Sequence, residues 1–345
     1  MSVVLITGSS GLVGSESVNF FSDKGFDVIG IDNNLRKFFF GKDGSTLWLK
    51  NKLLKRNKKF ISYNCDIRNY SYLEKIFKKY KSQISLIIHC AAQPSHDYGK
   101  NFPILDFEVN AKGTLNLLEL CKIYCPDAPF IFMSTNKVYG DLENYEYKER
   151  ETRYEVVGKP EGFDESCTLD FRSPYGCSKG AADQYMLDYS RNYGLKNIVF
   201  RHSSIFGGRQ YSTFDQGWVG WFIKQALVKK SNKKEPPFEI FGNGKQVRDI
   251  LFSPDLINCY FSAISKSDIC SGLAFNIGGG MTNSLSLIEL FNFLEEELQV
   301  KLNFDEKPWR TNDQKVFVAD TKKALKIFFS CFQGVEKSVG FGAWF

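Results

Sequence analysis

Histidines and paired cysteines are scarce in this chain. Its 345 residues include only three histidines, and the nine cysteines form no CxxC pair. Zinc sites and disulfide frameworks need such clusters, so we expect no metal site and a set of reduced, mostly buried thiols. No apolar run reaches the roughly 20 residues of a membrane-spanning helix, and no basic segment followed by an apolar one opens the chain. We therefore expect a cytoplasmic protein without membrane contact.

The excess of positive charge is modest and lies in two short stretches. The net charge is +6, and lysines gather in Lys50–Lys59 and Lys229–Lys234. A lysine run without interleaved aromatic residues is usually a solvated protein face. We therefore expect no nucleic-acid partner.

Short apolar runs alternate with segments of helical period along residues 1–200. The runs expected to form strands are Val3–Thr7, Asp27–Ile31, Lys59–Asn64, Leu86–His89, Pro129–Ser134 and Asn197–Arg201. The segments expected to form helices are Leu12–Lys24, Tyr70–Tyr80, Phe107–Tyr124 and Tyr175–Tyr193. Strands this apolar suit a parallel sheet that helices cover on both faces.

Past Arg201 the pattern loosens into loops rich in glycine, proline and aromatic residues. We therefore predict an α/β protein with a Rossmann-type doubly wound parallel sheet in residues 1–200. A smaller α/β substrate-binding domain is expected in residues 201–345, with some C-terminal segments returning to the first sheet. Residues 144–168 are dense in charge and contain Pro160, so we expect them to form a surface excursion.

Three glycines mark the turn between the first expected strand and the first expected helix. Gly8, Gly11 and Gly14 form a GxxGxxG array. In such a turn the first glycine permits a tight bend, the second lets the backbone approach a pyrophosphate, and the third allows the helix to pack closely on the strand. The helix N-terminus adds amide donors and partial positive charge. The array therefore predicts a dinucleotide site.

Asp32, at the end of the second expected strand, indicates which dinucleotide binds. Its distance from the glycines is typical of a carboxylate that binds the adenosine ribose diol. A carboxylate there repels a 2′-phosphate and favours NAD over NADP, although the nearby Arg36 softens the preference. The alternative is that Asp32 only caps a turn. The residues assigned to the cofactor site are Gly8, Gly11, Leu12, Val13, Gly14, Asp32, Asn33, Arg36, Asp66, Ile67, Ala91, Ala92 and Gln93, together with Tyr175 and Lys179.

Tyr175 and Lys179 lie one helical turn apart in an expected helix that begins at Ser173-Pro174. We expect the ammonium of Lys179 to lower the pKa of Tyr175 from its ordinary value near 10, and a positive nicotinamide ring to act in the same direction. Tyr175 then accepts the proton of an alcohol as hydride leaves for NAD, and Lys179 also bonds the nicotinamide ribose. The Tyr-x-x-x-Lys spacing alone arises by chance in many helices, and it gains meaning here from the glycine array.

Four segments carry a family resemblance: TGSSGLVG, AAQPSHD, STNKVYG and SPYGCSKGAADQY. Together they resemble the extended short-chain dehydrogenase/reductase family, in its branch of nucleotide-sugar epimerases and dehydratases. The resemblance covers essentially the whole chain. It implies NAD as cofactor, a nucleotide-sugar substrate and a homo-oligomer, either a dimer or a tetramer. It also implies that Thr135 is a third catalytic residue beside Tyr175 and Lys179, the alternative being a plain hydroxyl at a strand end.

The two residues after Thr135 bear on the type of reaction. Family members that dehydrate a 4-keto sugar carry an Asp-Glu pair at this point to shuttle protons, whereas this chain has Asn136 and Lys137. An amide and a fixed cation can hold hydroxyl, phosphate or ketone oxygens, but they are no general acid-base pair. The two residues therefore favour oxidation followed by reduction, which is epimerisation.

Several loops are more specific than the dehydrogenase motifs. Residues 32–46, 91–97, 149–155, 201–210 and 214–222 resemble the CDP-paratose 2-epimerases, also called CDP-tyvelose 2-epimerases. This implies that hydride leaves C2 of a CDP-linked dideoxyhexose and returns to the opposite face, with NAD regenerated in each turnover. The residues assigned to the substrate are His96, Asn136, Lys137, Ser204, Arg209, Gln210 and Arg248, of which Arg248 matches the diphosphate-binding arginine of the family.

Other functions remain open at this point. A UDP-hexose 4-epimerase would keep Thr135, Tyr175 and Lys179, so only the substrate loops argue against it. A 4,6-dehydratase and a non-catalytic NAD-binding sensor are further alternatives, and such a sensor usually loses its tyrosine or lysine. The nucleotide base, the exact sugar and the carbon that inverts are not fixed by the sequence.

Overall fold

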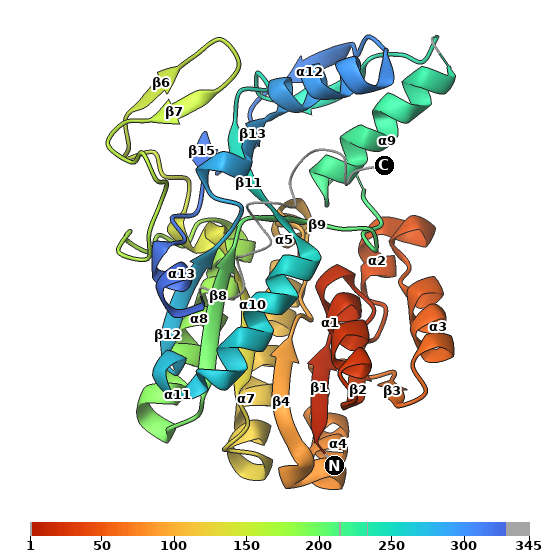
Figure 1. The fold of residues 1–345 in the computed structure, drawn as a ribbon, viewed down its shortest axis with the longest axis vertical. Helices are drawn as coiled ribbons and strands as arrows, with labels where there is room; N and C mark the ends of the chain where they lie inside the picture. The colour runs from red at the N-terminus through yellow and green to blue at the C-terminus, as the bar shows by residue number, and fades with distance from the viewer. Residues whose placement is uncertain (1, 214, 233, 329–345) are drawn as a thin grey trace.

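A seven-stranded parallel sheet forms the centre of the larger part of the molecule (Figure 1). The computed structural model describes residues 2–213, 215–232 and 234–328, so Phe214 and the last residues of the expected second domain lie outside it. The strand order is β12-β8-β5-β4-β1-β2-β3. The strands are β1 (Val3–Thr7), β2 (Asp27–Ile31), β3 (Phe60–Tyr63), β4 (Ile84–His89), β5 (Phe130–Thr135), β8 (Asn197–His202) and β12 (Leu273–Ile277). The order reverses between β1 and β4, and ligands of doubly wound sheets bind in the crevice at such a point.

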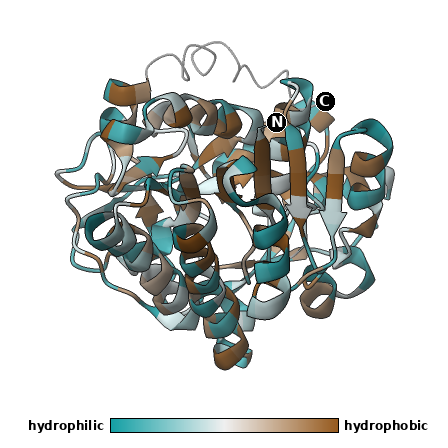
Figure 2. Ribbon diagram, turned by 90° about the horizontal axis from the view of Figure 1, so that it is seen from below, coloured by the Kyte–Doolittle hydropathy of each residue, from teal (hydrophilic) through white to brown (hydrophobic). Residues whose placement is uncertain are grey.

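Helices cover both faces of the sheet because the strands are apolar on both sides. Leu5 packs with the helices of one face, whereas Val4 and Ile6 pack with those of the other. The first face carries α4 (Tyr70–Tyr80), α7 (Gly113–Tyr124) and α8 (Ser173–Tyr193). The second carries α1 (Leu12–Asp23), α3 (Leu47–Arg56), α10 (Ser253–Ser265) and α13 (Lys322–Phe328). Figure 2 shows the apolar strands enclosed between helices, and the predicted doubly wound α/β architecture is confirmed.

A smaller unit lies beyond the carboxyl ends of the central strands (Figure 1). Its apolar cluster combines residues of α9 (Trp218–Ser231), α12 (Leu287–Leu298), β10 (Phe238–Phe241) and β11 (Val247–Phe252). The pairs are β10 with β14 (Phe304–Lys307), and β11 with β9 (Ser204–Phe206), β13 (Ser284–Ser286) and β15 (Val316–Phe317). The smaller C-terminal α/β unit that the sequence predicts is therefore present.

Short helical elements complete the described part of the chain. They are α2 (Arg36–Phe40), α5 (His96–Asn101), α6 (Pro103–Phe107), α11 (Ser267–Cys270), η1 (Gly41–Gly44), η2 (Lys81–Gln83), η3 (Glu108–Lys112), η4 (Asn136–Tyr139) and η5 (Met281–Asn283). Among the described residues, no helix is both long enough and apolar enough to cross a membrane. The eight cysteines of the same residues carry free thiols.

The expected elements of residues 3–202 agree with the structure to within two residues at most ends. The helix expected from Phe107 is an exception, because a π-helical turn, η3, separates α6 from α7. Residues 144–168 are not only a surface excursion. They form a hairpin of β6 (Tyr147–Glu149) and β7 (Tyr154–Val156), and Phe163 is fully buried. The domain boundary near residue 200 stays a prediction, and β12 joins the large sheet from beyond it.

Candidate active site

The turn between β1 and α1 leaves no room for side chains. Gly8 has a φ of +64°, and a Cβ there would lie 2.7 Å from the amide nitrogen of Ala91. A Cβ on Gly14 would lie 2.1 Å from the carbonyl oxygen of Gly8, so α1 packs directly on the turn. The first residues of α1 line an open cavity. This backbone cradle fits the pyrophosphate of a dinucleotide.

Asp32 directly follows β2 and lines the same cavity. Its carboxylate accepts hydrogen bonds from the backbone amides of Ser10 (2.9 Å) and Asn34 (2.8 Å). Burial raises the pKa of Asp32, and these two hydrogen bonds act in the opposite direction. The carboxylate oxygens keep further lone pairs that can accept ribose hydroxyls. The site therefore fits a dinucleotide with a free ribose diol, although Asp32 also closes the turn after β2.

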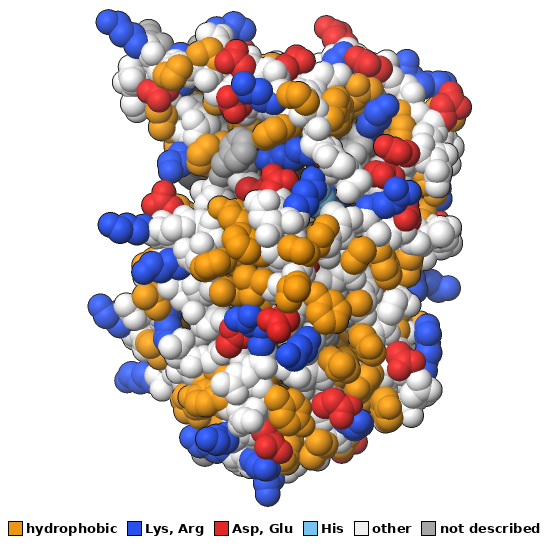
Figure 3. Space-filling view, turned by 180° about the vertical axis from the view of Figure 1, so that it is seen from behind, with side chains coloured by type: hydrophobic (Ala, Val, Ile, Leu, Met, Phe, Trp, Pro, Cys, Tyr) orange, Lys and Arg blue, Asp and Glu red, His pale blue; other side chains and the backbone are white. Residues whose placement is uncertain are grey.

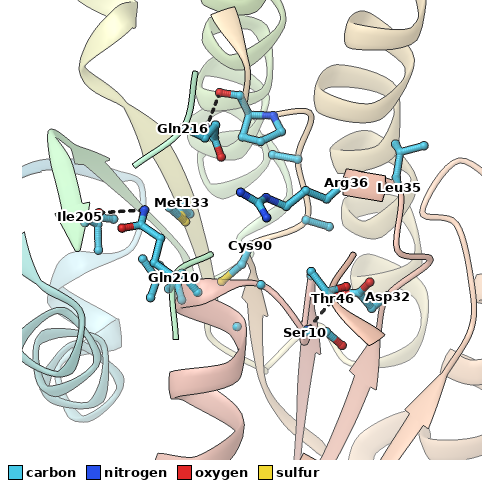
Figure 4. A pocket seen from close by; sticks show the side chains of 18 of the residues that line it. Ser10, Asp32, Leu35, Arg36, Thr46, Cys90, Met133, Ile205, Gln210 and Gln216 are labelled. Carbon is cyan, nitrogen blue, oxygen red and sulfur yellow. Dashed lines mark hydrogen bonds between the residues drawn. The ribbon is translucent and has the colours of Figure 1, made fainter. Parts of the chain in front are cut away.

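One cavity brings the predicted cofactor and catalytic residues together. It has a volume of about 360 Å³ and lies beyond the carboxyl ends of the central strands (Figure 4). The predicted residues that line it are Gly8, Gly11, Leu12, Val13, Gly14, Asp32, Asn33, Arg36, Asp66, Ile67, Ala91, Ala92, Thr135, Tyr175, Lys179, Ser204, Arg209 and Gln210. The predicted residues that do not line it are Gln93, His96, Asn136, Lys137 and Arg248.

Thr135 reaches this cavity from the end of β5, and Tyr175 reaches it from the first turn of α8. A side-chain hydrogen bond joins the two residues. Burial raises the pKa of Tyr175 to about 12, and the bond to Thr135 lowers it only in part. The expectation that Lys179 lowers this pKa is therefore wrong for the chain by itself. The phenol is neutral at ordinary pH before a cofactor binds.

Lys179 makes its close contacts with β5. Its Nζ donates a hydrogen bond to the carbonyl oxygen of Met133 (2.5 Å) and lies 4.1 Å from the ring centroid of Phe132. Burial lowers the pKa of Lys179 to about 8, against the opposing effect of Asp183. An ammonium has three donors, so the bond to Met133 leaves two for a ribose. The lysine is anchored for a role toward the cofactor rather than toward the phenol.

A second charged group lies outside this cavity and centres on Asp313. Arg248 Nη2 lies 2.7 Å from Asp313 Oδ1, and Lys137 Nζ lies 3.4 Å from the same oxygen. Burial by itself raises the pKa of Asp313, but Arg248 and Lys137 together lower it to about 2. The side chain of Lys137 is therefore held in an ion pair and only 19% exposed. Asp313 was not among the predicted site residues, and its only local signal in the sequence is a charged loop at residues 310–315.

Three further predicted residues, Asn136, Gln93 and His96, also lie outside the lining of the cavity. Asn136 donates through Nδ2 to Gln314 Oε1 (2.7 Å). Gln93 is fully buried and donates to Asp106 Oδ1 (2.6 Å). Its side chain therefore stabilises the loop after β4 from inside the protein. His96 lies at the start of α5, where burial and the charge of Lys137 lower its pKa to about 4. Its Nε2 is buried without a hydrogen-bond partner.

Two loops meet at the far end of the cavity, after β2 and β3. Asn33 donates through Nδ2 to Asp66 Oδ2 (2.8 Å), and Arg68 binds the same carboxylate through Nε and Nη2. Hydrogen bonds from Arg68 lower the pKa of Asp66, which burial by itself would raise. Asn33 and Asp66 both line the cavity. The pair thus holds one wall of the cavity, at two residues that the sequence assigns to the cofactor site.

A strap, residues 207–213 and 215–217, closes the cavity from the side of the smaller unit. Arg36 extends from α2 toward the middle of the cavity in Figure 4, and its Nη2 donates to the carbonyl oxygen of Tyr211 (2.6 Å). Gln216 donates to the carbonyl oxygen of Pro94 (2.9 Å). Arg209 forms an ion pair with Glu16 of α1, so this predicted substrate residue lies beside the cofactor cradle.

Comparisons with known proteins agree with this geometry. Residues 4–278 match the model of the NAD dependent epimerase/dehydratase family. The chain is 49% identical over 320 residues to the CDP-paratose 2-epimerase of Salmonella typhi, which covers 93% of this chain and 91% of that protein.

Two solved structures have the same fold. One is the UDP-glucose 4-epimerase of Thermotoga maritima with UDP-glucose, with a TM-score of 0.76, 27% identity, and coverage of 95% of this chain and 92% of that one. The other is the UDP-glucuronic acid 4-epimerase of Bacillus cereus with UDP-glucuronic acid and NAD, with a TM-score of 0.76, 25% identity, and coverage of 97% and 96%. With the glycine cradle, Asp32 and the Thr135-Tyr175-Lys179 cavity in place, the chain belongs to the NAD dependent epimerase/dehydratase family, and its cofactor is NAD.

Proposed function

We propose that the protein is a nucleotide-sugar 2-epimerase that interconverts CDP-paratose and CDP-tyvelose through a transient 2-keto sugar. The observation that carries this proposal is the cavity in which Thr135, Tyr175 and Lys179 share one space with the dinucleotide cradle. The 49% identity to a CDP-paratose 2-epimerase over most of both chains supports the sugar and the position of the reacting carbon.

The proposed roles follow from the contacts of each side chain. Bound NAD supplies the acceptor, and later the donor, of one hydride. Tyr175 takes the proton of the sugar hydroxyl and returns it on reduction, while Thr135 hydrogen-bonds the phenol and the reacting oxygen. Lys179 stays charged below its pKa of about 8 and holds the ribose from its anchor on Met133.

The residues after Thr135 support epimerisation over dehydration. Elimination needs an acid and a base beside the sugar. The amide of Asn136 is neither an acid nor a base at ordinary pH, and it donates a hydrogen bond to Gln314. Lys137 remains paired with Asp313. Neither side chain suits the shuttling of protons during an elimination.

We place the substrate diphosphate beside Arg248 and Lys137. Both cations lie within 3.4 Å of Asp313, which holds them close together. Two converging cations attract a diphosphate, and an arginine adds paired donors for its oxygens. A firm grip on the diphosphate leaves the sugar free to turn, as return of hydride to its opposite face requires.

A UDP-hexose 4-epimerase is the second candidate, because the two solved structures above carry UDP-sugars. The test is incubation with CDP-paratose, CDP-tyvelose, UDP-glucose and UDP-galactose in deuterium oxide, followed by NMR. We expect inversion at C2 of the CDP-sugars, seen in the proton coupling at C2, without uptake of solvent deuterium. Inversion at C4 alone would overturn the proposal.

A single variant tests the chemistry of the same site. Tyr175→Phe should lower turnover by roughly 100-fold or more, the usual contribution of a general base. Its NAD content should equal that of the parent protein. Normal turnover of Tyr175→Phe would show that another group carries the proton.

We also propose that the chain forms a homo-oligomer. Large apolar side chains are exposed on and near α6, with Ile104 at 74%, Phe107 at 55% and Phe102 at 40%. Figure 3 shows a broad apolar area on the face of the molecule opposite to that of Figure 1. Apolar patches of this kind often mark interfaces. Light scattering on the purified protein should give twice or four times the chain mass, and a monomer would contradict the proposal.

A further inference from the structure

A buried ion pair joins α8 to β8 behind the catalytic residues. Asp183 is fully buried and Arg201 is 4% exposed. Arg201 grips the carboxylate with two donors, Nη2 to Oδ1 (2.8 Å) and Nε to Oδ2 (3.0 Å). Neither residue lines the cavity. The pair therefore does not touch the reacting groups.

Asp183 lies on the helical stripe that carries the catalytic pair. Tyr175, Lys179 and Asp183 follow one another at intervals of four residues in α8, which places them on one face of the helix. Arg201 of β8 lies opposite Ser134 of β5 in the sheet register. The ion pair thus links the helix of Tyr175 to the two strands beside it.

The same ion pair holds both ends of the segment that contains Thr135. Ser134, just before Thr135, donates through Oγ to Asp183 Oδ2 (2.6 Å). Tyr139, at the end of η4, accepts a hydrogen bond from Arg201 Nη1 (3.0 Å) and donates to Asn276 Oδ1 (2.7 Å). Residues 134–139 are therefore attached to the ion pair at their start and at their end.

Stability alone is a weak reason for this arrangement. A buried ion pair must offset the loss of hydration of both charges, and apolar replacements of such pairs are often as stable. Here every carboxylate oxygen is used, because Gln184 donates to Oδ1 (3.0 Å) beside Arg201. A fully bonded buried network permits one geometry and resists others.

We infer that Asp183 and Arg201 are positioning residues, which set the spacing between Thr135 on β5 and the Tyr175-Lys179 pair on α8 by holding residues 134–139 at both ends. The inference rests on the catalytic roles proposed above. Reactions between groups held by protein contacts are sensitive to small displacements. Loosening either end of the segment should therefore slow the chemical step while substrate and NAD binding persist.

Ser134→Ala and Tyr139→Phe test this inference, because each removes one link and leaves the ion pair intact. We expect each variant to lower kcat by roughly 10-fold, since misplacement of reacting groups by about 1 Å can cost more than this. KM for the CDP-sugar should stay within about twofold, since these links lie outside the proposed diphosphate site. NAD content should not change in Tyr139→Phe, because Tyr139 does not line the cofactor cavity. The matched control is Tyr189→Phe, on the same helix, whose hydroxyl bonds Glu119 and which should keep full turnover.

An isotope effect separates positioning from general weakening of the fold. With substrate deuterated at the inverted carbon, the kinetic isotope effect on kcat should rise in both variants, because hydride transfer becomes more rate-limiting. A fall in activity that only follows the folded fraction, with an unchanged isotope effect, would overturn the inference. Parental kcat in both variants would do the same, provided that Tyr175→Phe in the same series is inactive. An active Tyr175→Phe would instead contradict the proposed catalytic roles themselves.

Discussion

The ammonium of Lys179 donates a hydrogen bond to the carbonyl oxygen of Met133, 2.5 Å away. The lysine is thus anchored to β5, and Tyr175 is bonded to Thr135. Burial dominates both groups, raising the pKa of Tyr175 to about 12 and lowering that of Lys179 to about 8. The chain alone therefore keeps the phenol neutral, and activation of the phenol depends on charge that arrives with the cofactor.

This arrangement predicts that NAD binding switches the ionisation of Tyr175. In the NAD-free protein the phenol should stay protonated between pH 8 and 10, because its pKa of about 12 lies above that range. Adding NAD should lower the pKa, since the positive nicotinamide favours the phenolate. The measurement is the tyrosinate absorbance of the parent protein minus that of Tyr175→Phe, with and without NAD. A tyrosinate signal from Tyr175 at pH 9 without NAD would contradict the prediction.

The glycine cradle gives a second prediction, on cofactor content. Gly14→Ala places a Cβ 2.1 Å from the carbonyl oxygen of Gly8, so α1 must shift away from the turn. We expect the affinity for NAD to fall by roughly 10-fold or more, because the backbone amides that would face the pyrophosphate move with the helix. Gly208→Ala is the control, since its Cβ would meet no atom within 4 Å. Equal NAD content in the two purified variants would contradict the packing argument.

The sequence predicts the parts of this site that are local in the chain. The glycine turn is recognised from its place between a strand and a helix, and the pairing of Tyr175 with Lys179 is recognised from helical periodicity. These glycines, Tyr175 and Lys179 line the same cavity. The anchor of Lys179 on Met133 could not be predicted, because 46 residues separate them and the contact depends on how α8 packs on β5. For the same reason the raised pKa of Tyr175 was missed, since burial outweighs a neighbouring charge.

The substrate side was harder to predict. Asp313 lies 176 residues after Lys137 and 65 after Arg248, and it is brought to them only by the fold of the smaller unit. The position of Gln93 in the sequence predicts a contact with the cofactor, yet its amide donates a hydrogen bond to Asp106 inside the protein. A motif gives the position of a residue along the chain, but the direction of its side chain depends on packing.

His202 predicts how stability depends on pH. Burial lowers its pKa to about 3, and the hydrogen bond to the carbonyl oxygen of Ser134 opposes this only in part. Between pH 6.5 and 3 the unfolded chain binds a proton at this position that the folded chain does not, so stability falls as pH falls below 6.5. At pH 5.5 the loss is about 1.4 kcal/mol relative to neutral pH.

Urea unfolding at pH 7.5 and 5.5 measures this effect. His202→Asn should lose about 1.4 kcal/mol less than the parent protein over the same interval, because the variant has no proton to bind there. His96→Asn serves as a comparison. The pKa of His96 is about 4, so removal of this histidine should also make the free energy of unfolding depend less on pH over the same interval. An equal pH dependence of the parent and His202→Asn would show that His202 does not contribute.

Substitution of the cations around Asp313 should weaken substrate binding without weakening cofactor binding. Lys137→Met and Arg248→Met should each raise KM for the nucleotide sugar by roughly 10-fold or more, the usual size of a hydrogen bond to a charged group. NAD content should not change, because neither residue lines the cofactor cavity. Lys245→Met is the control, since this nearby lysine pairs with the exposed Glu149. Unchanged KM in both variants would place the diphosphate elsewhere.

Arg36 predicts how firmly the cofactor is retained. Its guanidinium reaches from α2 to the carbonyl oxygen of Tyr211. This acceptor belongs to the main chain, so the hydrogen bond is removed by substituting Arg36 and not by substituting Tyr211. Arg36→Ala should therefore free this end of the strap and speed NAD release by roughly 10-fold, the size expected for one charged hydrogen bond. Turnover at saturating NAD should be preserved, because Arg36 is not one of the proposed catalytic residues Thr135, Tyr175 and Lys179. Arg56→Ala is the matched control, since Arg56 pairs with the exposed Asp23 on the surface. NAD release from Arg36→Ala at the rate of that control would mean that the remaining contacts, such as Gln216 to Pro94, hold the strap without it.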